Sequence, residues 1–448
     1  MTAIIIFVFL FGYLCIALES VLKINKAATA LLMCVACWTL FMVDPGQYFP
    51  EVAGIASDKA SQLINEHLLL RHLGDAGEIL FFLMGAMTIV EIVDANGGFN
   101  FVSDRLATRS KRKLLWRVAG ITFVLSAILD NLTTSIVMVM VLRKLVRDPK
   151  DRLTYAALVI LAANSGGAFS PIGDVTTIML WIKGCITTTG VMSEVLLPSI
   201  VSVVVPTFLL QFSLKGKLPD GQHHSAKTHA DEVVFSLWER NLVFFVGVGG
   251  LCFVPVFRFL TGLPPFMGIL LVLGLLWTMT EIFYRNKLVD CSMKQRVTKL
   301  LSRIDLSTIL FFLGILMAVG VLQETHVLTA FGQWLNEVSN GNHYLVTGVI
   351  GVVSSIVDNV PLVAGCMGMY PISTGDFAVD GIFWQLLAYC AGVGGSMLII
   401  GSAAGVVVMG LERISFGWYM KRISWIAAAG YFAGLFTYWL QNYIVALF

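Results

Sequence analysis

Residues 128–137 read ILDNLTTSIV, and the related stretch IVDNVPLVAG occurs 228 positions later, at 356–365. In both copies an Asp-Asn pair separates two apolar arms. The arms run over 115–130 and 131–146 in the first copy, and over 344–357 and 360–372 in the second. As helices, arms of this length would extend about 20–24 Å, which is short of the ~30 Å hydrocarbon core of a bilayer. We therefore expect each pair of arms to form a helical hairpin that enters a membrane and turns back.

The composition indicates that the chain is a membrane protein along its whole length. Of its 448 residues, 57% are apolar and 13% are charged, whereas soluble domains carry roughly 25% charged residues. Residues 2–18 are apolar without a preceding basic segment, so we expect a first span rather than a cleaved signal peptide. We expect full spans at about 2–20, 27–43, 77–96, 194–213, 239–257, 266–284, 307–322 and 423–446, and spans interrupted by glycine at 153–188 and 382–410.

Other features recur at or near the same spacing. The sequence ILFFL occurs at 79–83 and at 309–313, and the glycine pairs Gly166-Gly167 and Gly394-Gly395 are 228 positions apart. We predict an all-α polytopic membrane protein with inverted repeats, each holding a re-entrant helical hairpin and a broken transmembrane helix. The predicted parts are N-terminal helices and an outer loop at 1–70, repeat 1 at 71–214, cytoplasmic loops with two linking helices at 215–304, and repeat 2 at 305–448.

Loop charges predict the orientation of the two repeats. Lysines and arginines flank hairpin 1 on both sides, whereas none occurs between Arg303 and Arg413. Basic loops stay on the cytoplasmic side, so hairpin 1 is predicted to enter from the inside and hairpin 2 from the outside. With ten crossing segments, both termini are predicted to lie outside. Opposite orientation of two related halves is the inverted repeat of secondary transporters.

The hairpin tips and broken spans hold oxygen-bearing side chains at membrane depth. An ionised carboxylate near the bilayer centre is costly, so Asp130 and Asp358 would need water, a cation or a partner. Na⁺ is a hard cation and prefers oxygen ligands. We expect the helix to unwind between Asn164 and Asp174 and at Gly392–Ser396, because glycine and proline interrupt it. Each aspartate could instead act simply as a helix N-cap.

The remaining polar residues leave alternatives open. Glu78 and Glu91 fit either interface groups or a proton relay, and Asp305 fits a helix cap better than a functional acid. All seven histidines fall in predicted loops, and His223, His224 and His229 fit a solvated loop better than a pH sensor.

The arrangement resembles the ion transporter superfamily, most closely the NhaD-type sodium/proton antiporters. The resemblance is carried by DNLTT at 130–134, by NSGG at 164–167 with SPIGDVTT at 170–177, and by SSIVDNVP at 354–361. It implies that the transport site is lined by Asp130, Asn131, Thr133, Asn164, Asp174, Thr176, Ser354, Asp358, Asn359 and Ser396. It also implies a homodimer. Repeat 2 departs from repeat 1, because Val393 stands opposite Ser165 and Ser402 opposite Asp174.

We therefore predict a secondary transporter that exchanges Na⁺ or Li⁺ for H⁺ across the cell inner membrane by alternating access, with no enzyme activity. The lipid bilayer is its surroundings, nucleic acid is not a partner, and no cofactor is expected because no P-loop is present. A sodium-coupled anion carrier or an arsenite efflux permease shares the hairpin plan, but acidic tips would repel anions. A passive channel would share the oxygen ligands. An intramembrane protease is a remote alternative, because Pro171 stands where its GxGD motif requires glycine.

Overall fold

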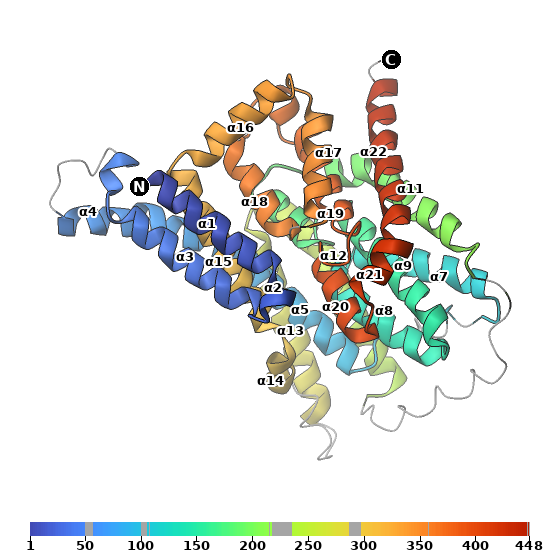
Figure 1. Cartoon of the computed structure of the whole chain (residues 1–448). Coiled ribbons are helices and arrows are strands. Elements are labelled where there is room, and N and C mark those ends of the chain that lie inside the picture. Colours follow the sequence, from blue (N-terminus) through green and yellow to red (C-terminus); the bar gives the residue numbers. More distant parts are fainter. Residues whose placement is uncertain are drawn as a thin grey trace.

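The computed structural model describes residues 1–49, 57–99, 105–106, 108–214, 216, 235–285, 297–356, 358–445 and 447. These residues fold predominantly into helices (Figure 1). The all-α prediction is confirmed. The predicted histidine loop around 223–229 lies outside the described residues, as does Val357 beside the second hairpin tip.

The N-terminal helices are close to their predicted positions. They are α1 (Thr2–Ala17), α2 (Glu19–Leu22), α3 (Lys26–Phe41), α4 (Ser57–Ile64), the π-helix η3 (Asn65–Leu69) and α5 (Leu70–Ala95). Helix α5 begins seven residues before the predicted span at 77–96, and it therefore includes His72, which is 9% exposed. The prediction that every histidine lies in a loop is wrong at this residue. His72 Nε2 lies 2.8 Å from Glu324 Oε1, and this hydrogen bond lets the imidazole be buried.

The first predicted hairpin region and broken span form helices α7 (Lys111–Ser126), α8 (Asn131–Leu145), α9 (Pro149–Ala168), α10 (Val175–Ile182) and α11 (Thr188–Leu210). Their counterparts in the second half are α17 (His343–Ser354), α18 (Asn359–Met369), α19 (Ile382–Gly394), α20 (Ala403–Glu412) and the bent pair α21 (Phe416–Arg422) and α22 (Ser424–Val445). Helix α7 packs on α9 as α17 packs on α19, and α11 packs along α22.

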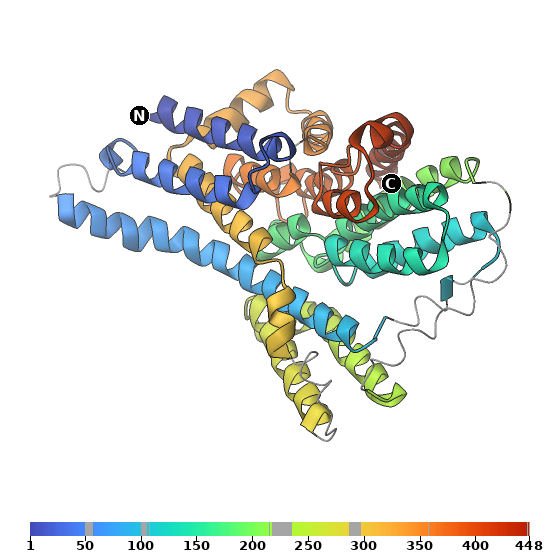
Figure 2. The same ribbon diagram turned by 60° about the horizontal axis from the view of Figure 1, so that its bottom comes forward.

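The remaining helices frame these two groups. They are α12 (Leu237–Thr261), α13 (Pro265–Arg285), α14 (Val297–Leu300), α15 (Leu306–Glu324) and α16 (Val327–Val338). Helix α16 was not predicted. Figure 2 shows α5 crossing the molecule, and α12 and α13 pack against it. Large apolar side chains on α12 stand free of the protein, with Phe245 69% and Phe259 87% exposed. Such a surface suits lipid rather than water.

Five helices in the described part of the chain are long and apolar enough to cross a membrane alone. They are Lys59–Ala95, Thr188–Leu210, Leu237–Thr261, Pro265–Arg285 and Leu306–Glu324, and the bent pair α21–α22 makes a sixth if counted as one span. Helices α1 and α3 have 16 residues each, so length and composition alone do not identify them as spans. The chain is thus a multi-pass membrane protein.

The glycine pairs correct one prediction. We expected the helix to unwind at Gly166-Gly167, but α9 continues through both glycines and ends at Ala168. A Cβ on Gly166 would lie 2.2 Å from the carbonyl oxygen of Phe123 in α7. In the second half, a Cβ on Gly394 would lie 2.2 Å from the carbonyl oxygen of Gly351 in α17. These glycines therefore allow close helix packing, and the breaks follow them at 169–174 and 395–402.

One ion-pair cluster joins the two halves away from the breaks. The carboxylate of Glu412, at the end of α20, accepts hydrogen bonds of 2.6 Å from Arg143 Nε of α8 and from Arg152 Nε of α9. The Glu412 side chain is 1% exposed. A carboxylate removed from water in this way is tolerated only when it is paired.

Gly166→Ala should lower the free energy of unfolding by about 1–3 kcal/mol, because the added methyl group must displace the backbone of α7. Gly120→Ala, also in a helix of this group, is the matched control because a Cβ there meets nothing within 4 Å. It should leave stability unchanged or raise it by up to ~1 kcal/mol. Thermal unfolding in detergent micelles measures both. Equal midpoints for the two variants would contradict the close packing.

Candidate functional site

The first hairpin tip holds a strained aspartate. Asp130 is the N-cap of α8, and its carboxylate accepts hydrogen bonds from Thr133 N at 2.7 Å and from Thr133 Oγ1 at 2.8 Å. Its backbone has φ 121° and ψ 158°, a region that is almost restricted to glycine. Strain of this kind persists only where the surrounding structure enforces it, and it clusters at functional sites.

The second tip reaches across to the first half of the chain. Asp358 is the N-cap of α18, with Oδ1 3.3 Å from Val360 N. The next residue, Asn359, is 4% exposed, and its Nδ2 donates to Asp174 Oδ2 at 3.3 Å. The tip of one hairpin therefore contacts the broken helix of the other half.

Asp174 lies at the meeting point of these elements. It is 1% exposed, it caps α10 by accepting from Thr176 N at 3.3 Å, and it interacts electrostatically with Asp358 and, more weakly, with Asp130. The hydroxyl of Thr176 is buried and makes no hydrogen bond of good geometry in the part of the chain that the structure describes, although it lies close enough to interact with the Asp174 carboxylate. A buried carboxylate next to an unpaired hydroxyl offers oxygen ligands for a hard cation.

Asn164 forms the second bridge between the halves. Its Oδ1 accepts from Asn131 Nδ2 at 3.1 Å, and its Nδ2 donates to Ser402 Oγ at 2.9 Å. Asn131, Asn164 and Ser402 are all buried. The predicted residues around the two breaks thus form two buried hydrogen-bonded groups, Asn131–Asn164–Ser402 and Asn359–Asp174–Thr176, which together we call the polar network.

Two of the predicted ligands, Ser354 and Ser396, donate their hydroxyl hydrogen bonds to backbone carbonyls instead. Ser354 Oγ donates to the carbonyl of Ala391 at 2.9 Å, just as Ser126 Oγ donates to the carbonyl of Ala163 at 2.6 Å, 228 positions earlier. Ser396 Oγ donates to the carbonyl of Val393 at 2.5 Å. These serines fasten the first arm of hairpin 2 and the break in their own half. Their hydroxyl oxygens keep lone pairs but do not join the network.

Sequence reasoning missed a basic residue beside the second tip. Lys26, which directly precedes the predicted span at 27–43, is the first residue of α3, and its Nζ lies 3.0 Å from Asp358 Oδ2. The two side chains are 20% and 14% exposed. The residues are 332 positions apart, and neither lies in a motif that would pair them.

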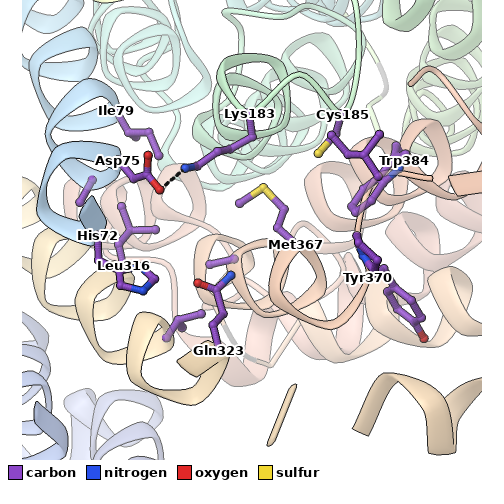
Figure 3. Close-up of a pocket in the computed structure, with 15 residues that line it drawn as sticks. His72, Asp75, Ile79, Lys183, Cys185, Leu316, Gln323, Met367, Tyr370 and Trp384 are labelled. Atoms are coloured by element: carbon purple, nitrogen blue, oxygen red, sulfur yellow. Dashed lines mark ion pairs between the residues drawn. The ribbon is translucent and has the colours of Figure 1, made fainter. Parts of the chain in front are cut away.

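Two cavities approach the network from different helices. One, of about 270 Å³, is lined by Tyr13, Glu19, Lys26 and Asp358 together with apolar residues. The other, of about 240 Å³, lies among α5, α15, α18, α19 and the segment that follows α10. Figure 3 shows His72, Asp75, Lys183, Gln323 and Met367 around it, with the Asp75–Lys183 ion pair of 2.5 Å across one side.

The three acids whose roles the sequence left open, Glu78, Glu91 and Asp305, lie outside this network. Glu91 pairs with Arg303 at 3.1 Å, with 29% and 53% of the side chains exposed, which suits an interface group. Asp305 is the N-cap of α15 and accepts from Thr308 N at 3.2 Å, so the capping interpretation is confirmed. Glu78 is partly buried in α5 and interacts with Arg258.

Comparisons with known proteins agree with this arrangement. A family model described as citrate transporter matches residues 13–388. Sodium/proton antiporter 1 of Arabidopsis thaliana is 46% identical over 427 residues, covering 95% of this chain and 70% of that protein. Sodium/proton antiporter 2 of the same plant is 42% identical, covering 95% and 96%. The Na⁺/H⁺ antiporter NhaD of Vibrio parahaemolyticus is 32% identical, covering 82% and 89%.

The chain belongs to the NhaD-type antiporters of the ion transporter superfamily. The resemblance seen in its motifs is confirmed. The relatives are named for transport and not for catalysis, in agreement with the prediction that the chain is not an enzyme. Their names identify Na⁺ and H⁺ as the transported ions, and they mention no cofactor.

The two neighbouring threonines of α10 allow a direct test of the unpaired hydroxyl. Thr177 Oγ1 donates to the carbonyl of Asp174 at 2.8 Å, whereas Thr176 Oγ1 makes no hydrogen bond of good geometry to any described residue and has only a weaker interaction with the Asp174 carboxylate. Thr177→Val should lower the free energy of unfolding by about 1 kcal/mol, and Thr176→Val should leave it unchanged or raise it. Chemical unfolding in detergent measures both. If Thr176→Val proved the more damaging change, the hydroxyl would have a partner that this geometry lacks.

Proposed function

We propose that the chain exchanges Na⁺, or Li⁺, for H⁺ across a membrane by alternating access. Its similarity to named sodium/proton antiporters over most of its length supports this function. The observation that carries the mechanism is Asp174, a buried carboxylate at the contact between the two halves, hydrogen-bonded to Asn359 of the opposite hairpin tip. Such a group is stable when it holds either a cation or a proton.

The ten predicted residues form this site with unequal roles. Asp174, Thr176, Asn131, Asn164 and Asn359 would offer oxygen ligands around the two breaks. Asp130 with Thr133, and Asp358, would act at the hairpin tips. Ser354 and Ser396 would hold the arm and break of the second half. Because Na⁺ and H⁺ compete for the same carboxylate, binding of one expels the other, and this competition couples the two fluxes.

We also propose that the two halves are inverted repeats with re-entrant hairpins, divided near 71–214 and 305–448. Contacts that recur at a spacing of 228 residues support the repeat, among them Gly166 on α7 with Gly394 on α17. Breaks between short helices near Asp130 and Asp358 support the hairpins. The loop charges support opposite orientations and both termini outside. The inner-membrane location stays a prediction. The homodimer stays a prediction.

An organic anion is the substrate that the family description suggests instead. A carboxylate-rich substrate would have to approach Asp130, Asp174 and Asp358, three acids that lie close enough for Asp174 to interact with the other two. Like charges in a site of low polarity repel strongly. The acids therefore favour a cation as the transported species.

Flux measurements in proteoliposomes test the proposal. The wild-type protein should couple Na⁺ or Li⁺ addition to a change in internal pH, and Asp174→Asn should lower the rate at least about tenfold, because it removes the central charge of the ion site. Asp305→Asn is the matched control, because it makes the same change at an exposed helix cap. It should retain exchange. Thr176→Val should raise the half-saturating Na⁺ concentration.

Each outcome has a separate meaning. If the wild-type protein moved labelled citrate and showed no cation-driven pH change, the exchange function would be wrong. If Asp174→Asn exchanged as fast as Asp305→Asn, the function would stand but the central role of Asp174 would not.

A further inference from the structure

The aspartates at the two hairpin tips have different hydrogen-bond partners. The carboxylate of Asp130 is held within its own helix by the backbone N–H and the hydroxyl of Thr133. The residue at the corresponding position of the second half is Pro361, which has neither a backbone N–H nor a hydroxyl. Asp358 therefore lacks both of those hydrogen bonds.

Lys26 supplies the missing partner from outside the repeat. Its ammonium donates to Asp358 Oδ2 at 3.0 Å and lies 4.3 Å from the centre of the Phe311 ring. A cation over an aromatic face is stabilised electrostatically. The backbone N–H of Lys26 donates to Glu19 Oε1 at 3.1 Å, which fixes the start of α3. The ammonium is thus held at the hairpin tip by two contacts, and the backbone of the same residue is held by a third.

The surrounding cavity has room and ligands for a free cation. Its volume is about 270 Å³, and its lining residues include Tyr13, Glu19 and Asp358, which carry side-chain oxygens. A water molecule occupies about 30 Å³, so the cavity can hold an ion with several waters. The Tyr13 hydroxyl is buried and unpaired among the described residues, although it lies near enough to interact with Asp358. An unpaired buried hydroxyl oxygen next to a carboxylate is available as a ligand for a cation.

We propose that the Lys26 ammonium is a tethered cation that occupies the cation position at Asp358 whenever this half of the site holds no transported ion. A monovalent cation entering the cavity must displace Lys26 to reach Asp358, and Tyr13 then completes its ligands. The idea rests on the proposed exchange function and extends it. It makes helices α1 to α3, which precede the predicted repeats, part of the transport site.

A simpler role for the ion pair is to fasten α3 to hairpin 2. The two roles differ in one measurable respect. A structural ion pair stays closed while ions are transported, whereas a tethered cation is released when Na⁺ binds. The accessibility of the Lys26 amine in the wild-type protein therefore separates them without any substitution.

Amine labelling with a small acylating reagent, read by mass spectrometry, measures this release. Saturating Na⁺ should raise the labelling rate of Lys26 in wild-type proteoliposomes by about fivefold or more relative to choline, the range of ordinary coupling between two ligands. Lys23 is exposed and lies in the same sample as an internal control. Its rate should stay constant. If Na⁺ at a concentration that saturates exchange left Lys26 labelling unchanged, the proposal would be overturned.

Substitutions give a second, independent readout. Lys26→Met should lower the half-saturating Na⁺ concentration about fivefold or more, because the competing cation is gone. Lys26→Arg, which keeps the charge, should stay close to wild type, and Lys23→Met should do the same. Equal half-saturation for Lys26→Met and Lys23→Met would count against displacement. A wild-type protein without any Na⁺/H⁺ exchange would instead refute the underlying function.

Discussion

The structure depends on keeping one buried carboxylate satisfied. Asp174 has almost no contact with solvent, and a charge in such a place is tolerated only with hydrogen bonds and a partner. The break at 169–174 frees the N–H groups at the start of α10, and the carboxylate caps them. Gly173 lets this break approach the backbone of Ser126, because any Cβ there would meet its carbonyl at 2.6 Å. Asn359 then ties the carboxylate to the other half.

The two halves share a backbone plan but not their chemistry. Matching glycines bring α7 against α9 and α17 against α19. The polar residues at matching positions differ, because Ser402 stands where the first half has Asp174 and Pro361 stands where it has Thr133. The first half thus carries its own acid and hydroxyl ligands. Asp358, in contrast, pairs with a lysine of α3, which precedes the proposed repeats.

Much of the fold could be predicted because apolar runs and glycine or proline breaks are local signals. These signals predicted the approximate positions of the spans, the arms and both breaks. The spacing of 228 residues then grouped the candidate ligands of the two halves into one predicted site. Long-range pairing left no such signal. Lys26 looked like a loop charge. His72 lies before the predicted span at 77–96, because the length of that helix was underestimated. Gly166 looked like a helix break, because the sequence alone does not reveal the α7 backbone that packs beside it. Amphipathic α16 was missed because its 12 residues are too few to cross a membrane.

The Glu412 cluster restricts how such a molecule can change shape. Its carboxylate binds arginines from α8 and α9 while belonging to α20. Parting these three helices would leave a desolvated anion without either counter-charge, at a cost of several kcal/mol. We therefore expect these three helices to move together. In alternating access, the ion site must open to one side of the membrane and close to the other. The helices that move for this purpose must meet at interfaces without ion pairs, where apolar surfaces can slide past each other at little energetic cost.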